Sequence, residues 1–293
     1  MKIIDPHLHF FDRKKGNYAW LKADQAPFWP DKKRIDSDFS VQDLILQAPF
    51  ELEGLVHIEA GFDNSQPWRE IQWLERSLTD SNRGLRTIAF LDLRLTDTVF
   101  SQHLDRLCQQ RSVVGFRHIF PDQASQLITC QQVQRNLQKI AQVKKIFECQ
   151  LQGTDTPAIN HLNALLAPCS PVDISGLRFV INHVAFANAQ ASSEEYASWY
   201  NNMQVLAANQ NVYIKASGWE MVNRQYQPLD LQRVIDDLLS CFGEDRIMLA
   251  SNFPLCLLST SYQNLWQNYA NLRMSVTQKS KLMHLNAQRI YDF

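Results

Sequence analysis

Eight short apolar runs recur along the chain, and longer stretches with helical spacing separate them. The runs are rich in β-branched and aromatic residues and are continuous rather than alternating, which is typical of strands buried on both faces. They cover residues 2–9, 54–60, 85–93, 113–119, 145–151, 177–184, 211–216 and 246–251. Between two of them, Trp68, Ile71 and Leu74 recur at the spacing of a helix face. Eight strands that alternate with helices predict a (β/α)8 barrel.

A doubly wound sheet would show the same local pattern. Its dinucleotide-binding form needs a glycine-rich turn after the first strand, and the residues from His7 to Phe11 include no glycine. The whole chain of 293 residues has only 9 glycines, so loops that cradle phosphate are scarce throughout. The barrel is therefore the preferred fold.

We expect residues 1–293 to form a single domain, because no linker rich in proline, glycine or serine divides the chain. Barrels of about 250 residues commonly form one domain. Residues 11–40 are too many for an ordinary connection between elements. Their Trp20, Phe28 and Trp29 predict an ordered loop or lid.

The charge balance excludes several classes of partner. The chain has 29 Lys+Arg against 30 Asp+Glu, so it offers no electrostatic footprint for nucleic acid or an anionic membrane. The N-terminus lacks the apolar core of a secretory signal, and no apolar run approaches the ~20 residues of a membrane span. The 6 cysteines are scattered without a CxxC pair, which predicts free buried thiols in a reducing compartment. We therefore expect a cytoplasmic protein whose partner is a small molecule, with its oligomeric state left open.

Polar side chains gather at the predicted strand ends. In a (β/α)8 barrel, the C-terminal strand ends meet at one mouth and carry the chemistry. Histidine and other polar residues at these ends are His7, His9, His57, Glu59, Arg117, His118, Glu148, Gln150, Asn182, His183, Lys215 and Asn252. We therefore expect one site at this mouth.

His7 and His9 are two residues apart on the first strand. On an extended strand, such residues point to the same face, so both imidazoles can converge on one ion or ligand. His183 is a candidate third ligand, or a hydrogen-bond partner of a substrate oxygen. The alternative is a set of structural or solvated histidines.

Arg117 and His118 place a permanent cation beside a titratable ring. Arginine can clamp a substrate carboxylate with two parallel hydrogen bonds. The alternative for Arg117 is an ion pair with a barrel acid such as Glu148. For Lys215 we expect a buried ion pair rather than a Schiff base.

His57 and Glu59 both lie near the end of the second strand. One of the two side chains can face the surrounding helices instead of the mouth. Glu59 lies nearer the strand end, so we favour it for the site.

The motif Asp5-Pro6-His7-Leu8-His9 resembles the D-x-H-x-H opening of the amidohydrolase superfamily. Further motifs follow in the order of that superfamily: Tyr18-Ala19-Trp20-Leu21, Val56-His57-Ile58-Glu59-Ala60, Gly115-Phe116-Arg117-His118, Asn182-His183, Lys215-Ala216-Ser217-Gly218-Trp219, Ser251-Asn252-Phe253-Pro254 and Asn286-Ala287-Gln288-Arg289-Ile290-Tyr291. Together they resemble the amidohydrolase-2 branch, which contains sugar-lactone and 2-pyrone-4,6-dicarboxylate lactonases.

The resemblance implies a distorted (β/α)8 barrel that hydrolyses a C–O or C–N bond in a small cyclic substrate. Water attacks a carbonyl in this chemistry, and a lactone is the expected substrate. His7, His9 and His183 would hold a single divalent metal, with zinc the first choice. In a metal-independent form, the histidines and Arg117 would polarise the carbonyl instead.

The resemblance also implies the residues that would bind substrate. Arg117, His118 and Gln150 would hold an acidic or hydroxylated ring. Trp219, together with Trp20 from the early loop, would wall the pocket.

Two departures from the family pattern bear on mechanism. The strand-eight motif of the family is usually Ser-Asp-Trp-Pro, and here Asn252 stands in place of the aspartate. Asparagine cannot accept a proton at neutral pH, so the base must be relocated to Glu59, His118 or His183. Gln150 stands where binuclear members carry a histidine, which argues against a two-metal site.

Two other functions stay open at this point. Related barrels catalyse decarboxylation or hydration with similar sites. Asn252 can also mark a ligand-binding barrel with impaired catalysis.

Overall fold

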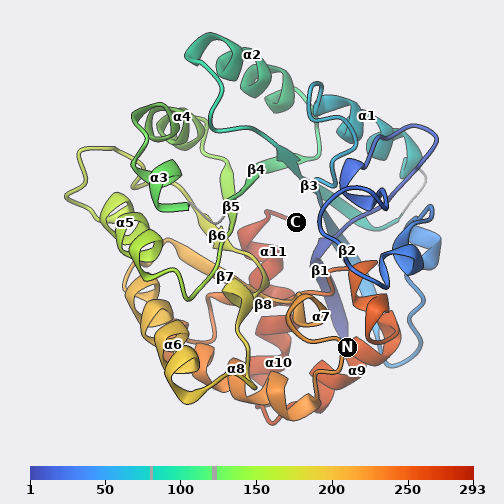
Figure 1. Ribbon diagram of the computed structural model, residues 1–293. Coiled ribbons are helices and arrows are strands. Elements are labelled where there is room, and N and C mark those ends of the chain that lie inside the picture. The colour runs from blue at the N-terminus through green and yellow to red at the C-terminus, as the bar shows by residue number, and fades with distance from the viewer. Residues whose placement is uncertain (80–81, 121–123) are drawn as a thin grey trace.

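The computed structural model describes residues 1–79, 82–120 and 124–293. Eight strands form one parallel sheet in the order of the chain (Figure 1). They are β1 (Lys2–Leu8), β2 (Glu51–Ile58), β3 (Gly84–Phe90), β4 (Val113–Ile119), β5 (Ile146–Gln150), β6 (Phe179–Ile181), β7 (Val212–Ala216) and β8 (Ile247–Leu249). Each of the eight overlaps one predicted strand, and the prediction of a (β/α)8 barrel is confirmed.

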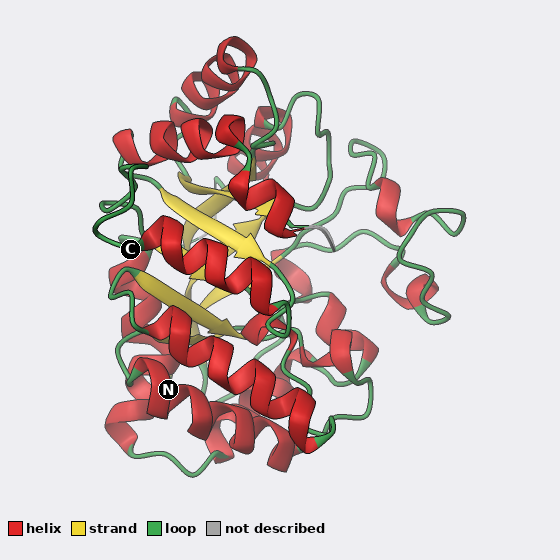
Figure 2. Cartoon of the chain, turned by 60° about the vertical axis from the view of Figure 1, so that its left-hand side comes forward, coloured by secondary structure: helices red, strands yellow, loops and turns green. Residues whose placement is uncertain are grey.

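Helices surround the sheet (Figure 1). The α-helices are α1 (Trp68–Ser77), α2 (Asp97–Cys108), α3 (Ala124–Thr129), α4 (Gln131–Gln142), α5 (Thr156–Leu166), α6 (Ser193–Ala207), α7 (Trp219–Val222), α8 (Pro228–Phe242), α9 (Tyr262–Asn271), α10 (Val276–Ser280) and α11 (Asn286–Ile290). The 3-10 turns are η1 (Ala19–Leu21), η2 (Lys32–Ile35), η3 (Val41–Asp43), η4 (His183–Phe186) and η5 (Leu255–Leu258), and η6 (Lys281–Leu285) is a π-helix. The long loops and short helices project from the side toward which the strand arrows point (Figure 2).

Helix α8 shows how local sequence sets an element. Gln227 and Asp230 form a capping box around Pro228, whose missing N–H costs nothing in the first turn. The helix ends at Gly243, whose φ of 68° suits a residue without a side chain. Its apolar face is buried against the sheet, as the helical spacing predicts.

The first and last strands close the barrel over a short seam. The backbone N–H of His9 donates to the Phe253 carbonyl at 2.7 Å, and that of Asn252 donates to the His7 carbonyl at 2.8 Å. Nearer the barrel interior, the Asp5 carboxylate takes the place of a backbone partner and accepts from the N–H of Ser251 at 3.1 Å. The seam therefore brings the strand-one histidines beside Asn252.

A separate apolar cluster fills the barrel interior, and the C-terminal helix closes it. Ile4, Val56 and Val180 belong to this cluster, together with Ile290 and Tyr291. In Figure 1, α11 lies across the middle of the ring of strands. The opposite end, where the polar strand ends meet, is left for the site.

A charged network crosses the interior above Tyr291. The Lys215 ammonium lies 2.6 Å from the Glu148 carboxylate, and both residues are fully buried. Tyr291 Oη and Asn182 Nδ2 also donate to this carboxylate, each at 2.7 Å. The expected ion pair of Lys215 is confirmed, and Glu148 is its partner.

Residues 11–40 border the mouth, where Trp20, Pro27 and Trp29 line a cavity. Phe11 and Phe39 form an isolated antiparallel bridge at the two ends of this segment. Inside the segment, Tyr18, Leu21 and Ile35 are buried in an aromatic-rich cluster. The segment packs as an ordered loop that contains η1 and η2.

All six cysteines are free thiols, as predicted. The expectation that they are buried is wrong for most of them, because only Cys149 and Cys256 are buried. Cys130 and Cys169 are exposed, since they lie outside the packed faces of the helices. Within the described ranges, no helix is both long enough and apolar enough to cross a membrane.

Candidate active site

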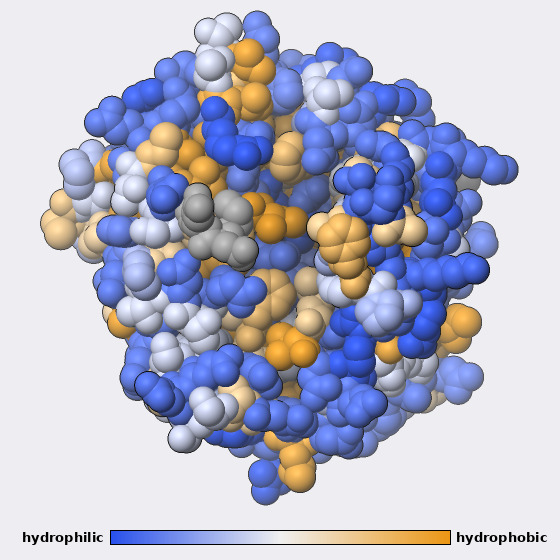
Figure 3. Space-filling view, in the orientation of Figure 1, coloured by the Kyte–Doolittle hydropathy of each residue, from blue (hydrophilic) through white to orange (hydrophobic). Residues whose placement is uncertain are grey.

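A cavity of about 590 Å³ opens at the C-terminal ends of the strands. The residues that line it are His9, Trp20, Pro27, Trp29, Glu59, Ala60, Gly61, Asn64, Phe90, Arg94, Arg117, His118, Ile119, Gln150, His183, Met221, Asn252 and Leu255. The face in Figure 3 is hollowed near its middle, with hydrophobic and hydrophilic residues around the hollow. A second hollow of about 910 Å³ lies beside β2 and holds none of the predicted site residues among those that line it.

The predicted histidines meet at the floor of this cavity. The ring centre of His7 lies 5.1 Å from that of His9 and 4.4 Å from that of His183. His9 and His183 border the cavity, and His7 is fully buried beside them. Side chains separated by more than 170 residues along the chain are thus neighbours in space, as the barrel prediction requires.

Hydrogen bonds fix two of the three rings. His9 Nδ1 lies 2.8 Å from the carbonyl oxygen of Ile58, which can only accept, so Nδ1 carries the proton and Nε2 keeps its lone pair. His183 Nδ1 lies 3.0 Å from Ser217 Oγ. Both ring nitrogens of His7 are buried without a hydrogen-bond partner among the described residues.

Burial lowers the pKa of all three imidazoles well below 6.5. Nearby positive charge adds to the effect, and Arg117 contributes to the lowered pKa of each ring. The three rings are therefore neutral at pH 7, which is the form in which imidazole binds a metal.

We tested this cluster for its fit to a metal ion. Across residues 1–79, 82–120 and 124–293, no group of three His, Cys, Asp or Glu side chains is already placed to hold one ion. The donor chemistry nevertheless suits zinc: the rings are neutral, His7 has two unpartnered nitrogens, and oxygen atoms hold the Nδ1 atoms of His9 and His183. Oxygen partners of this kind orient imidazole ligands in metal sites.

The chain approaches His183 in an unusual conformation. His183, Val184, Ala185 and Phe186 have φ values of 54°, 47°, 50° and 58°, all left-handed. Such angles are rare for a branched side chain like that of Val184 and concentrate at functional sites. Gly218 packs against the same ring, and a Cβ atom there would lie 2.6 Å from the His183 ring.

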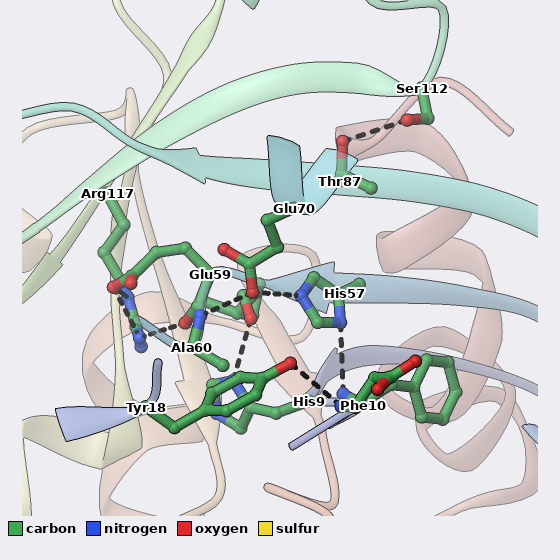
Figure 4. A network of polar contacts seen from close by, with 12 residues as sticks. His9, Phe10, Tyr18, His57, Glu59, Ala60, Glu70, Thr87, Ser112 and Arg117 are labelled. Atoms are coloured by element: carbon green, nitrogen blue, oxygen red, sulfur yellow. Dashed lines mark hydrogen bonds and ion pairs between the residues drawn. The ribbon is translucent and has the colours of Figure 1, made fainter. Parts of the chain in front are cut away.

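Arg117 and Glu59 form an ion pair at the cavity wall (Figure 4). Arg117 Nε and Nη2 lie 2.8 and 2.7 Å from the same oxygen, Glu59 Oε1, and Nη2 also donates to the Glu59 backbone carbonyl. The alternative role of Arg117, an ion pair with a barrel acid, is therefore the one observed, although the acid is Glu59 and not Glu148, which binds Lys215. The sequence could not distinguish these two acids, because both lie at strand ends.

His57 faces the helices. Its Nε2 lies 3.0 Å from Glu70 Oε1 in α1, and Glu70 also accepts from the N–H of Ala60 (Figure 4). Burial raises the pKa of Glu70 to about 8 and lowers that of His57 to about 3, so this is a pair of neutral groups. Of the two strand-two candidates, Glu59 is the one that borders the cavity.

His118 and Gln150 also line the cavity. The N–H of Leu93 donates to His118 Nδ1 at 3.2 Å, so the neutral ring carries its proton on Nε2 and can donate it to a ligand. A second arginine at the cavity, Arg94, is bound by the Asp92 carboxylate through two hydrogen bonds of 2.9 and 2.8 Å.

Aromatic residues of the early loop form one wall. Trp20 lines the cavity, and its indole N–H donates to the Ala60 carbonyl at 2.8 Å. Trp29 lies beside it and stacks under the Arg224 guanidinium, whose carbon is 5.0 Å from the ring centre. Arg224 also pairs with Asp31 at 2.8 Å.

The structure does not bring Trp219 to this wall. Its indole N–H donates to Tyr269 Oη at 2.7 Å, so the ring packs toward α9. The next residues of α7, Glu220 and Met221, lie closer to the site, and Met221 lines the cavity.

Asn252 lines the cavity at the end of β8 and has a left-handed φ of 56°. Its Nδ2 donates to Glu220 Oε1 at 2.5 Å. Glu220, which was not among the residues predicted for the site, is a buried carboxylate whose pKa burial raises to about 7. The sequence feature that could have identified it is its position directly after the motif Lys215-Ala216-Ser217-Gly218-Trp219.

Comparison with known proteins identifies the family of this chain. A model of the family described as Amidohydrolase matches residues 4–293. Among curated proteins, an L-fucono-1,5-lactonase of Burkholderia multivorans is 24% identical over 308 residues, which cover 98% of this chain and 95% of that protein.

Solved structures share the fold. An amidohydrolase of Burkholderia multivorans with bound zinc has a TM-score of 0.81 at 21% identity, with both chains covered to 100%. A Pseudomonas putida protein assigned as a 2-pyrone-4,6-dicarboxylic acid hydrolase has a TM-score of 0.68 at 19% identity, with 99% of this chain and 97% of that chain covered. The match to the family model spans almost the whole sequence. The chain therefore belongs to the Amidohydrolase family and is an enzyme of the hydrolase type.

Proposed function

We propose that this hydrolase opens a small, neutral, hydroxylated lactone. The observation that carries the proposal is the charge balance of the cavity. Both arginines among its described lining residues are already paired, Arg117 with Glu59 and Arg94 with Asp92. A ring with two carboxylates would find no unpaired cation among these lining residues, because Glu59 already neutralises Arg117, the residue expected to bind an acidic substrate.

The remaining lining suits a sugar-like ring. Trp20 and Trp29 present flat apolar surface, against which the C–H face of such a ring can pack. His118, Gln150 and Asn64 offer hydrogen bonds to hydroxyl groups. The similarity to an L-fucono-1,5-lactonase also supports a sugar lactone as substrate.

In the proposed reaction, water adds to the lactone carbonyl carbon and the ring C–O bond breaks, which gives a hydroxy acid. Glu59 Oε1 is held by Arg117, whereas Glu59 Oε2 has no hydrogen bond among the described residues and belongs to a side chain that borders the cavity. We assign Glu59 Oε2 as the acceptor of the proton from water. Glu59 then gives this proton to the ring oxygen as the C–O bond breaks, and the carboxylic acid that forms ionises at neutral pH.

The proposal assigns one zinc ion to His7, His9 and His183, on the strength of their neutral, partly unpartnered nitrogens. A zinc-bound structure with the same fold adds support. When bound, zinc polarises a carbonyl and lowers the pKa of a bound water. Without zinc, the ring N–H of His183 or His7 would hold the carbonyl oxygen, because His9 donates its N–H to the Ile58 carbonyl.

A panel of neutral sugar lactones and pyrone dicarboxylates, followed by acid release at constant pH, tests the proposal. We expect kcat/KM to favour the neutral lactones by at least about tenfold, which corresponds to roughly 1.4 kcal/mol. The double variant H7A/H9A should lose both turnover and zinc in protein purified without chelator. A preference for dicarboxylates would overturn the proposed substrate class.

Two other outcomes would overturn the reaction itself. Release of CO2 without ring opening would identify a decarboxylase. A rise in melting temperature with a lactone that is never hydrolysed would identify a ligand-binding barrel.

A further inference from the structure

Glu220 is a buried acid behind the cavity floor. It is the second residue of α7 and is only 1% exposed. Its Oε1 accepts from Asn252 Nδ2 at 2.5 Å, and its Oε2 has no hydrogen-bond partner among the described residues. The nearby Arg224 guanidinium donates to the Glu220 backbone carbonyl rather than to the carboxylate.

The chemistry of the contact fixes the direction of the Asn252 amide. A carboxylate only accepts hydrogen bonds, so the amide must turn its NH2 group toward Glu220. The amide oxygen, Asn252 Oδ1, is then a buried acceptor with no hydrogen-bond partner at normal distance among the described residues. It lies near the His9 ring, whose pKa burial lowers and this oxygen raises to a smaller extent. Asn252 lines the cavity beside His9, so this oxygen is available to a group bound there.

We propose that Glu220 is a positioning residue, which holds the Asn252 amide with its oxygen toward the cavity. The attacking water or a substrate hydroxyl would donate to this oxygen. Asn252 thereby keeps the acceptor role of the aspartate that the family usually carries, without its basicity. The effect on turnover rests on the proposed function, whereas the orientation of the amide does not.

Protonation of Glu220 would remove the constraint on the amide and permit the reverse arrangement. A carboxylic acid O–H would donate to Asn252 Oδ1, and the NH2 group would then face the cavity. The titratable and charged groups that face Glu220 are Arg224, Tyr226, Cys256 and Tyr269. Burial raises the pKa of these tyrosines and of Cys256, so they stay neutral near pH 7, where Glu220 changes charge.

The same contact predicts how the family residue would behave here. In N252D, two buried carboxyl groups would meet at the 2.5 Å contact and would share one proton. The new aspartate would therefore not be a free base. In the double variant N252D/E220Q, the glutamine amide would donate to the aspartate and leave it ionised.

Side-chain amide NMR of protein labelled with 15N-asparagine tests the orientation without any substrate. The Asn252 signal is assigned by its loss in N252A. It should shift with pH, with a midpoint near 7, in the wild type. The shift should persist in E70Q, which alters a buried glutamate bound to His57 and Ala60 rather than to Asn252, and disappear in E220Q. A midpoint near 7 that survives in E220Q would overturn the proposal, and so would an Asn252 signal that does not titrate in the wild type.

Kinetics then test the consequence for turnover. With a lactone substrate, E220M removes the acceptor of the Asn252 amide N–H and should lower kcat by roughly 10–100-fold, as lost orienting partners typically do, with KM within about twofold. E220Q keeps an acceptor for this N–H and should lower kcat less. The double variant N252D/E220Q should exceed N252D in kcat by at least about tenfold. Equal kcat values for these two would overturn the positioning role. If the Asn252 signal titrates as expected but no lactone is hydrolysed, the orientation of the amide would stand and only the proposed function would be refuted.

Discussion

Arg117 holds one oxygen of Glu59 and leaves the other free. Its Nε and Nη2 atoms lie 2.8 and 2.7 Å from Glu59 Oε1, and no hydrogen bond to Oε2 occurs within the described part of the chain. One carboxylate can therefore be anchored and still offer a lone pair to a ligand. In the cavity as a whole, the pair cancels a positive charge that would otherwise attract anions.

This relationship predicts the effect of E59Q. Glutamine keeps the shape and an acceptor for Arg117 but cannot take a proton. We expect kcat for lactone opening to fall by about 10²–10⁴-fold, the usual loss for a positioned base. Steady-state acid release at constant pH measures it.

E75Q is the matched control. Glu75 in α1 accepts from the backbone and hydroxyl of Ser112, each at 2.8 Å, and lies outside the cavity lining. A kcat of E59Q within twofold of the wild type would exclude Glu59 as the base.

Ser217 should influence zinc through His183. Its hydroxyl holds His183 Nδ1 at 3.0 Å, and loss of such an orienting partner costs roughly 10–100-fold in metal affinity. We therefore expect S217A to bind zinc more weakly by that factor in competition with a chromophoric chelator. S259A removes another buried hydroxyl, one without a hydrogen-bond partner among the described residues, and should bind zinc as the wild type does. Equal affinities of S217A and the wild type would contradict the assignment of His183.

Breaking the buried ion pair between Lys215 and Glu148 should lower the free energy of unfolding of the protein. K215M removes the ammonium and leaves Glu148 buried without its counter-charge, which should cost about 3–5 kcal/mol. In K215M/E148Q the remaining amide is neutral and still has Tyr291 and Asn182 beside it, so part of the loss should be recovered. Urea denaturation measures both. Equal stability of the two variants would show that the buried charge is not the cause.

Glu70 should make stability depend on pH. Its pKa is about 8 in the folded protein against an ordinary value of 4.5, because burial disfavours the charged form. Its contribution is fully present below pH 4.5 and is lost as the pH rises toward 8, since the unfolded chain releases the proton first. In E70Q this loss is absent. Urea denaturation between pH 5 and 8 should therefore show a smaller decline for E70Q than for the wild type, and parallel curves would contradict the assignment.

The strands were predictable because both of their faces are buried. Continuous runs of this length that are rich in β-branched residues are typical of strands buried on both faces. Each of the eight runs overlaps one strand of the structure. The sixth prediction ran too far, to residue 184, whereas β6 ends at Ile181. From His183 onward the chain takes left-handed angles without any glycine, and no residue there signals the turn.

The convergence of the histidines was predictable for a topological reason. Parallel strands of a barrel end at the same mouth, so residues at those ends become neighbours whatever their separation along the chain. Individual partners were not predictable in the same way. Arg117 had two acids within reach, and only the packing decides that Glu59 binds it while Glu148 binds Lys215.

Glu220 and Trp219 show most clearly which features could not be predicted from the sequence. Both belong to α7, a helix of 4 residues, and one turn has no periodicity from which to tell an inward side chain from an outward one. The aromatic residue was expected at the cavity, but it bonds to Tyr269. The acid beside it reaches Asn252.

The segment around α7 also joins the end of β8 to the loop of residues 11–40. Glu220 accepts a hydrogen bond from Asn252 at the end of β8, and Met221 forms part of the cavity wall. Arg224 forms an ion pair with Asp31 in the loop of residues 11–40. Exchanging that loop for one from a relative, in order to change which ring the enzyme accepts, would release Arg224 at the same time. A graft of residues 11–40 would therefore have to bring along a matching acid at the position of Asp31, or the altered specificity would come with a disturbed catalytic floor.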